Sequence, residues 1–307
     1  MAKKWLAYFV LLLGVAAGGA WWIWNEATTR LEAESANWIR ARTAEGWRIR
    51  VPPPVRTGFP FAAALRFDGM RVDSPAGFGW RAERAVLGLY PQDPGQLRLT
   101  LEGAQSFTHP QGITPIQQKE LSLRFRLDGQ GGTLEGEDLR LGETTSMRRV
   151  SVEIFNAQVN ARADQMAVTG LPRFDTVHVT GRLTRPPASS LAAWRDSGGA
   201  LSVERAEFRT GEVIAMLSAT LTLDQQLQPE GRGILTLTGV QEAVTLMTEA
   251  GFVAPNQAPL LRTVLGLAAR VPPEGGPPRV EAPLELRGRR LTAARLPITT
   301  LPAIAWR

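Results

Sequence analysis

Residues 121–128 read Leu-Ser-Leu-Arg-Phe-Arg-Leu-Asp, with an apolar residue at every odd position and a polar or charged residue at every even one. Successive side chains of a β-strand point to opposite faces, so this period of two predicts a strand with one apolar face. Residues 97–102, Leu-Arg-Leu-Thr-Leu-Glu, repeat the pattern. From Trp47 onward we therefore predict a mainly β fold of half-buried antiparallel strands.

A short signature recurs along this part of the chain: two apolar residues two positions apart, one further residue, then glycine. The five glycines concerned are Gly103, Gly129, Gly181, Gly239 and Gly288. Each is predicted to end a strand in a turn, because glycine takes positive φ without steric cost. The copies are irregularly spaced, which favours a long antiparallel meander over a solenoid of fixed period. Whether its apolar face forms an open groove or a closed core stays undecided.

Three short helices are expected to cover the sheet, and a Pro/Gly linker precedes a final strand pair. The helices are predicted at 188–195, 241–250 and 258–270, and the linker at 272–278. The β-rich domain then spans 47–307. A subdivision near 186–199 is an option, but a single extended sheet is preferred because no flexible linker separates the halves.

The N-terminus predicts a membrane anchor over residues 1–24. Trp5 to Trp24 is a run of twenty residues without a charge, long enough to cross a hydrocarbon core of about 30 Å as a helix. A basic flank precedes the run and an acidic flank follows it, so the N-terminus stays in the cytoplasm and the bulk of the chain is periplasmic. The anchor residues are Lys3, Lys4, Trp5, Leu11, Trp21, Trp22 and Trp24, the tryptophans forming an interfacial belt.

A cleavable signal peptide is the alternative, with Leu6 to Val15 as its apolar region and 18–20, Gly-Gly-Ala, as its cleavage site. Both interpretations export the chain. We favour the uncleaved anchor, since a mature chain beginning Trp-Trp-Ile-Trp would expose apolar surface with nothing to cover it. Residues 25–46 then predict a stalk or docking helix that ends at Gly46.

Composition excludes several classes of function. The 307 residues contain no Cys and two His, which removes disulfide scaffolds, thiol nucleophiles and Cys-ligated metal sites. The net charge is +6, but the arginines are scattered singly, so we expect a solvated basic surface and no nucleic-acid partner. No nucleophile elbow, phosphate-binding loop or zinc motif occurs. We therefore predict no catalytic residue, no metal and no cofactor, and a protein that is not an enzyme.

Four features in order resemble the bacterial family known as domain of unknown function 2125. They are the N-terminal membrane segment, the motif Gly-Phe-Pro-Phe at 58–61, the stretch from Trp194 to Leu201 leading to Asp224 and Gly231, and the closing run 288–302. The resemblance implies a Gram-negative envelope protein with no assigned catalytic residues. The strand-to-glycine pattern is also similar in style to AsmA-like and bridge-like lipid-handling proteins, which form grooved β-sheets.

Two functions follow as expectations. In the first, an inner-membrane-anchored periplasmic sheet binds lipid acyl chains in a β-groove. In the second, the same face is a closed core, and the protein is an envelope scaffold or assembly factor with protein partners; an envelope hydrolase is least favoured. Phe59 and Phe61 either sit in the core at a bend made by Pro60 or form an aromatic lip at the end of the groove.

Overall fold

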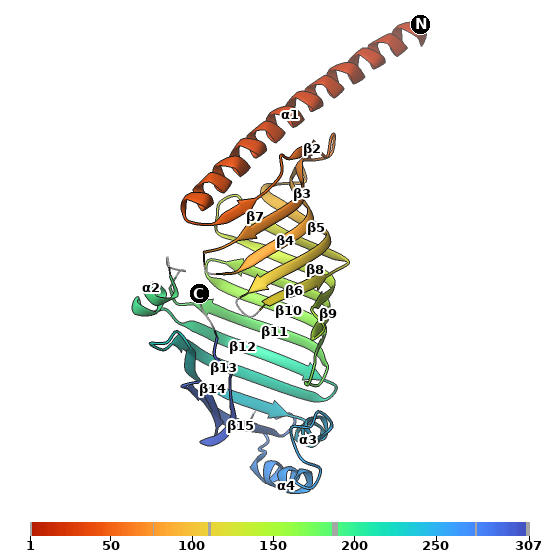
Figure 1. Ribbon diagram of the computed structural model, residues 1–307. Helices are drawn as coiled ribbons and strands as arrows, with labels where there is room; N and C mark the ends of the chain where they lie inside the picture. Colours follow the sequence, from red (N-terminus) through yellow and green to blue (C-terminus); the bar gives the residue numbers. More distant parts are fainter. Residues whose placement is uncertain (1, 76, 110–111, 186–189, 274, 305–307) are drawn as a thin grey trace. The chain divides into compact units, whose positions relative to one another are not determined.

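The computed structural model describes residues 2–75, 77–109, 112–185, 190–273 and 275–304, except for the side chains of 2–17 and Leu296 (Figure 1). The chain falls into two compact units. Unit 1 comprises residues 1–116 and 120–129, and unit 2 comprises residues 117–119 and the chain from 130 onward. Strands dominate both units, which confirms the mainly β fold.

Unit 1 begins with a single long helix, α1 (Ala2–Ala44). The sequence suggested an anchor and a separate stalk helix, but the helix runs without a break, since no proline interrupts it. Gly46 ends it with φ +89°, as predicted. Lys3, Lys4, Trp5 and Leu11 lie outside the described side chains. Within the part of the chain that is described, no helix is both long enough and apolar enough to span a bilayer.

The strands of unit 1 form one antiparallel sheet in which β3, β4, β5 and β7 are successive neighbours. Both β1 and β2 pair with β3, and β6 pairs with β5. The bounds are β1 (Arg48–Arg50), β2 (Val55–Thr57), β3 (Ala63–Asp73), β4 (Gly79–Tyr90), β5 (Asp93–His109), β6 (Gly112–Gln117) and β7 (Glu120–Arg126). The stretch 121–127 that predicted the fold is therefore confirmed as a strand up to Arg126.

The second half of α1 closes the core of unit 1. It contacts β1 and β3, and its residues Thr28 and Leu31 are buried. On β3, Leu65 is 0% exposed, and Ala85 on β4, which lies opposite Phe67, is equally inaccessible. This part of α1 is thus a docking helix and not a free stalk.

Unit 2 is a meander in which every strand pairs antiparallel with the next one along the chain, from β8 to β17. Its strands are β8 (Gly131–Leu141), β9 (Thr145–Phe155), β10 (Gln158–Val168), β11 (Phe174–Leu183), β12 (Leu201–Thr210), β13 (Val213–Leu223), β14 (Pro229–Thr238), β15 (Arg279–Arg287), β16 (Arg290–Ala293) and β17 (Leu296–Thr300). The segment 186–199 lies between β11 and β12, which pair directly with each other. Residues 186–189 are outside the described residues.

The short helices form at the predicted places but do not cover the sheet. They are α2 (Leu191–Asp196), α3 (Val240–Glu249) and α4 (Ala258–Ala268). The α2 helix has no buried residue, while α3 and α4 pack against each other around Val244, Val253 and Ala258. Leu261 and Leu265 of α4 pack against this small core, whereas Leu260 and Val264 of the same helix are exposed. The expected covering role is therefore wrong for α3 and α4.

The glycine signature is confirmed at three of its five places. Gly239 and Gly288 have positive φ directly after a strand, and Gly129 has positive φ in the turn that follows β7, after two intervening residues. Gly103 lies inside β5, where an extra residue opposite β4 forms a bulge, and Gly181 lies beside a register shift inside β11. The prediction failed there because a bulge depends on the partner strand and not on the local sequence.

Candidate functional site

Unit 2 presents one continuous apolar sheet face, which we call the apolar face. Paired registers place its members opposite one another from strand to strand: Val152 faces Ala161, Val179 faces Ala206, and Leu217 faces Leu235. Across β9 to β15 the face includes Val150, Val152, Ala161, Ala163, Val177, Val179, Val203, Ala206, Phe208, Val213, Ala215, Leu217, Ala219, Leu221, Gly233, Leu235, Leu237, Ala282 and Leu284.

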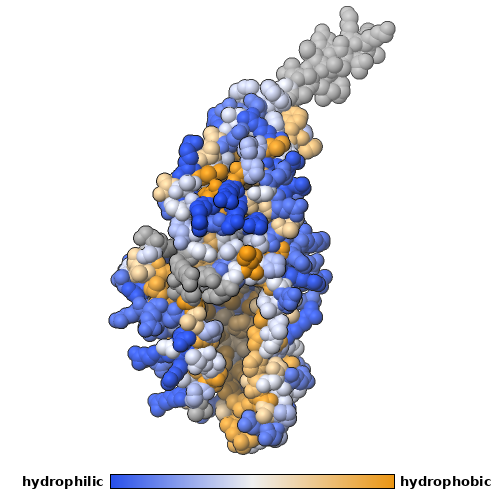
Figure 2. All heavy atoms as spheres, viewed as in Figure 1, coloured by the Kyte–Doolittle hydropathy of each residue, from blue (hydrophilic) through white to orange (hydrophobic). Residues whose placement is uncertain are grey.

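The apolar face is not closed over by any described element. Of its Val, Leu and Phe side chains, all within the described ranges, only Val177 and Val213 are buried, at 9% and 8% exposed. The others are all partly exposed, in contrast with the fully inaccessible Leu65 of unit 1. Figure 2 shows a hollow with orange walls over the strands of unit 2. Large exposed apolar surfaces of proteins commonly serve as interaction sites.

Small residues give this face its depth at β13 and β14. Ala219 lies opposite Gly233, and a Cβ added to Gly233 would come within 2.5 Å of the Ser218 carbonyl oxygen. The two strands therefore approach more closely than a side chain at this position would allow. Leucines flank the pair on both strands at Leu217 and Leu235. The result is a two-residue depression, which Val203 on β12 and Leu284 on β15 border across the sheet.

The opposite face of the sheet is mainly polar, although Ile214, Met216 and Ile234 also lie on it. Its best-defined group is an ion-paired carboxylate. Glu207 on β12 is buried and accepts hydrogen bonds from Arg205 and Arg209, which lie on either side of it on the same strand. The hydrogen bond from Arg209 is the main cause that lowers the pKa of Glu207 below its ordinary 4.5, burial acts in the opposite direction, and Arg205 adds to the lowering.

Glu207→Gln is expected to destabilise unit 2 at pH 7 by roughly 1 kcal/mol, because both arginines are about half exposed and screened by water. A carboxylate whose folded pKa is depressed stabilises the fold above its unfolded pKa, and this stabilisation is lost as the pH falls through the folded pKa. The difference in melting temperature between variant and parent should thus shrink below about pH 4.5. A difference that stays constant down to pH 3 would assign the effect to packing.

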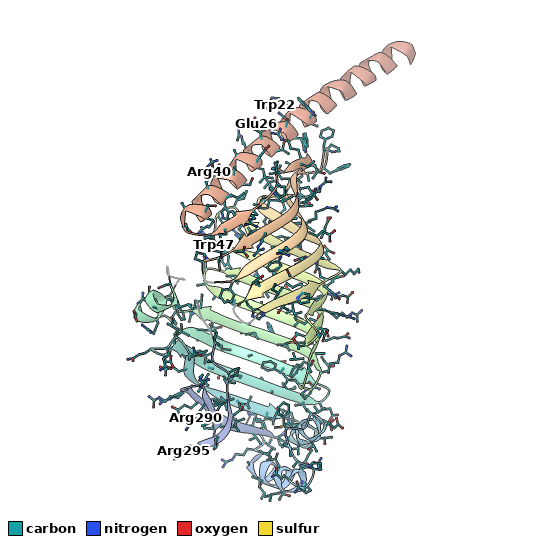
Figure 3. All side chains as sticks on the ribbon, in the orientation of Figure 1. Trp22, Glu26, Arg40, Trp47, Arg290 and Arg295 are labelled. Atoms are coloured by element: carbon teal, nitrogen blue, oxygen red, sulfur yellow. The ribbon has the colours of Figure 1, made fainter. Side chains whose placement is uncertain are left out.

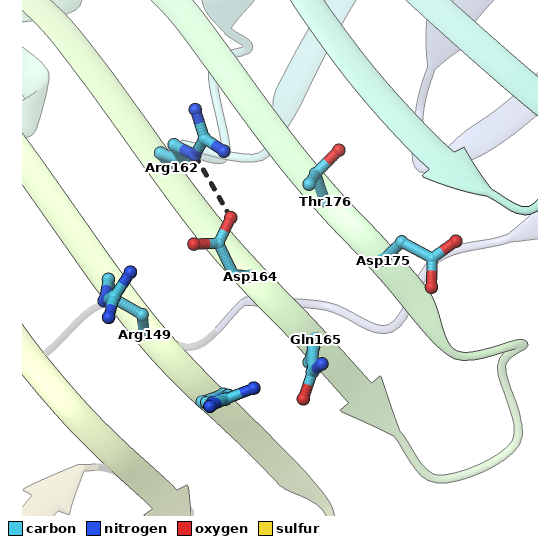
Figure 4. Close-up of a pocket in the computed structure, with 7 residues that line it drawn as sticks. Arg149, Arg162, Asp164, Gln165, Asp175 and Thr176 are labelled. Carbon is cyan, nitrogen blue, oxygen red and sulfur yellow. Dashed lines mark hydrogen bonds and ion pairs between the residues drawn. The ribbon is translucent and has the colours of Figure 1, made fainter.

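A shallow polar depression lies at the end of β9, β10 and β11 (Figure 4). It is lined by Arg148, Arg149, Arg162, Asp164, Gln165, Asp175 and Thr176. Arg162 and Asp164 pair with each other at 3.1 Å. Positively and negatively charged side chains are mixed in this depression and are accessible to water, as on an ordinary solvated surface. The lining therefore indicates no particular ligand.

No reactive cluster accompanies these surfaces in the described part of the chain. There, no group of three or more His, Asp or Glu side chains is placed to hold a metal ion. The ring nitrogen Nε2 of His178 lies 2.9 Å from the Asn160 side-chain oxygen, on the polar face of the sheet. His109 contacts Thr114 at 3.1 Å.

Unit 1 carries a second apolar surface, where α1 meets the turn between β2 and β3. The Trp24 indole Nε1 donates to the Thr57 carbonyl oxygen at 3.2 Å, and its ring meets the Phe59 ring edge-on at 5.6 Å. Arg56 donates to Glu32 at 2.9 Å and to Asn25 at 3.0 Å. These contacts fix the turn to the helix at the level of Trp22 and Glu26, which are labelled in Figure 3.

The aromatic residues of this turn are on the surface. Phe59 is 46% and Phe61 is 76% exposed, so the interpretation that seats both rings in the core is wrong. Gly58 makes the turn possible: its φ is +91°, and a Cβ there would lie 2.6 Å from the Ala62 carbonyl oxygen. The amides of Phe61 and Ala62 both donate to the Gly58 carbonyl oxygen, at 2.9 and 2.8 Å. The turn thus holds its two phenylalanines outward.

We call the exposed apolar residues around this turn the collar. They are Trp21, Trp22 and Ile23 of α1, Val55 of β2, and Phe59 and Phe61 of the turn. The sequence had selected the two tryptophans as an anchor belt and the two phenylalanines as a groove lip, without joining them. It missed Ile23 and Val55, which carry no distinguishing local pattern.

Fold and surfaces together define a mainly β protein with an N-terminal docking helix and a large half-exposed apolar sheet face. Comparison with known proteins identifies the family: a family model described as an uncharacterized protein conserved in bacteria (DUF2125) matches residues 22–302. The chain belongs to this family, as the resemblance suggested. No curated protein and no solved structure matches it significantly.

Proposed function

We propose that this protein is a non-enzymatic, inner-membrane-anchored periplasmic protein of the Gram-negative envelope that holds lipid acyl chains on its apolar face. The observation that carries the proposal is the half-exposed state of that face. Leu217, Leu235 and Leu284 lie on neighbouring strands, and none of the three is buried. Such surface gains free energy when an apolar ligand removes it from water, about 25 cal/mol for each Å².

The shape of the face supports a chain-like ligand. Ala219 and Gly233 form a small depression among leucines, and the apolar face continues from strand to strand, so a flexible acyl chain can lie on it without needing a polar partner. The described face offers aliphatic and aromatic side chains, and polar residues occupy the other side of the same strands. A ligand with a polar core would leave its hydrogen-bonding groups unpaired here.

Photo-crosslinking tests the proposal at the level of one side chain. Benzoylphenylalanine is placed either at Leu235 on the apolar face or at its neighbour Thr236 on the polar face, in the full chain purified in polymer nanodiscs. Mass spectrometry should find lipid attached at 235 and none at 236. Lipid around the membrane segment itself cannot produce that difference. A protein adduct at 235, with no lipid, would support the scaffold function instead.

Topology is a separate prediction. Lys3 and Lys4 lie before the apolar run and Glu26, Glu32 and Glu34 after it, so the N-terminus should stay in the cytoplasm. Alkaline phosphatase fused to the C-terminus is expected to be active in cells, because it folds only after export. Green fluorescent protein at the same position should be dark after export through the general secretory route. The reverse result would place the bulk of the chain in the cytoplasm.

A further inference from the structure

We propose that the collar is a second membrane contact, so that the Phe59/Phe61 turn dips into the bilayer surface beside α1. The inference rests on the proposed membrane attachment. It adds a second point of attachment, in which the turn between β2 and β3 holds unit 1 against the lipid. Its occupant is the headgroup and upper acyl region of a phospholipid bilayer.

The change of character along α1 is the first observation. From Trp24 onward the helix has one buried side, marked by Thr28 and Leu31. At Trp21, Trp22 and Ile23 three consecutive residues are exposed, although together they cover most of the helix circumference. A helix that is apolar all round requires an apolar environment all round. Since unit 1 does not provide one at this level, a bilayer is the environment that fits.

The direction of α1 gives the second observation. Trp24 lies against Thr57 and Phe59, while the other end of the helix leads into β1, which pairs with β3 at Asp73. The helix therefore runs along unit 1 from the turn to the far end of β3. Residues 2–20 continue beyond the turn as helix, roughly 28 Å at 1.5 Å per residue (Figure 1). The collar is the level at which the uncharged part of the helix, residues 5–20, leaves the folded unit.

The rigidity of the turn is the third observation. Phe59 is held by Trp24, and Arg56 is held by Glu32 and Asn25, so the turn cannot move away from the helix without breaking these contacts. Phe61, the most exposed residue of the collar, is two residues from Phe59 and is therefore held beside α1 with it. Aromatic residues are favoured at this depth of a membrane because they tolerate its mixed polar and apolar character.

Site-directed spin labelling tests the inference on the full chain. The chain contains no cysteine, so Phe61→Cys, Trp22→Cys and Ile113→Cys each provide a single label site. Ile113 is exposed in the same unit, but the strand registers align it with the Asp73 end of β3, opposite to the turn. The proteins are reconstituted into vesicles of phosphatidylethanolamine and phosphatidylglycerol, and label depth is read from relaxation by oxygen and by a water-soluble nickel chelate.

The label at 61 is expected roughly 5–10 Å below the lipid phosphates, and the label at 113 in water. A deep label at 22 with a label at 61 as water-accessible as that at 113 would overturn the collar as a membrane contact and leave the anchor intact. Water-exposed labels at both 22 and 61 would overturn the membrane attachment itself. Dipolar broadening between labels at 61, with no lipid depth, would assign the collar to a second copy of the chain and also overturn the inference.

Discussion

Leu217→Asp is expected to remove roughly nine-tenths or more of the lipid that crosslinks from position 235, while the protein stays folded. Leu217 lies directly opposite Leu235 on the apolar face and is partly exposed. In the lipid-free protein the new carboxylate keeps its water, so folding costs little. Bound acyl chains would strip that water away, and an unpaired charge in such surroundings costs several kcal/mol. Each 1.4 kcal/mol weakens binding tenfold.

Ser218→Asp is the matched control, since it adds the same charge one residue along β13 but on the polar face. Crosslinked lipid should remain at the parent level, and circular dichroism melts should be alike for both variants. If Leu217→Asp unfolds unit 2 while Ser218→Asp does not, the apolar face is a closed core in solution. That result would contradict the lipid-binding function and favour the scaffold.

Leu65→Ala is expected to have the largest effect on stability, about 3 kcal/mol. Its side chain is fully inaccessible on β3, the strand that α1 covers with Thr28 and Leu31. Removing it leaves a cavity that a sheet braced by a helix cannot collapse around. Hydrogen exchange of the β3 amides in the full chain should become about a hundredfold faster, because 3 kcal/mol corresponds to about two powers of ten.

Leu127→Ala provides the comparison within unit 1, as this leucine is an exposed residue just after β7. Its effect on the same amides should be below about 0.5 kcal/mol. Equal acceleration in both variants would show that α1 does not close the core over Leu65. Comparison of the two variants thus measures how firmly α1 is docked on unit 1, independently of any ligand.

Local pattern was sufficient to predict the strands and the short helices of this chain. The alternation in 121–127 depends only on neighbouring residues, and it became β7; the apolar stripe at 241–250 likewise became α3. The predicted break between the anchor and the stalk helix does not exist, since α1 is continuous. A change from apolar to charged residues alters what a helix packs against, but it does not interrupt the helical backbone. Gly103 and Gly181 were misassigned since the bulges beside them are created by pairing with another strand.

The candidate surfaces were predicted less well. Sequence shows which face of each strand is apolar, but whether anything covers it depends on where distant helices pack. The stripes of α3 and α4 are consistent with a lid over the sheet, yet part of each stripe packs between the two helices, and Leu260 and Val264 are exposed. The residues next to Phe59 in the sequence do not show whether its ring is buried or exposed. Its position depends on the contact with Trp24, which is distant in the sequence.

The pairing order of unit 2 bears on how its ligand surface can vary in length. Each of its strands bonds to the strands before and after it in the chain, so a hairpin inserted at the β13–β14 turn would lengthen the sheet without altering any other register. Sequence-local pairing also lets the sheet assemble progressively from its N-terminal edge while the remaining chain is still being synthesised. Addition or deletion of hairpins is thus a route by which relatives of this protein can change the length of the apolar face.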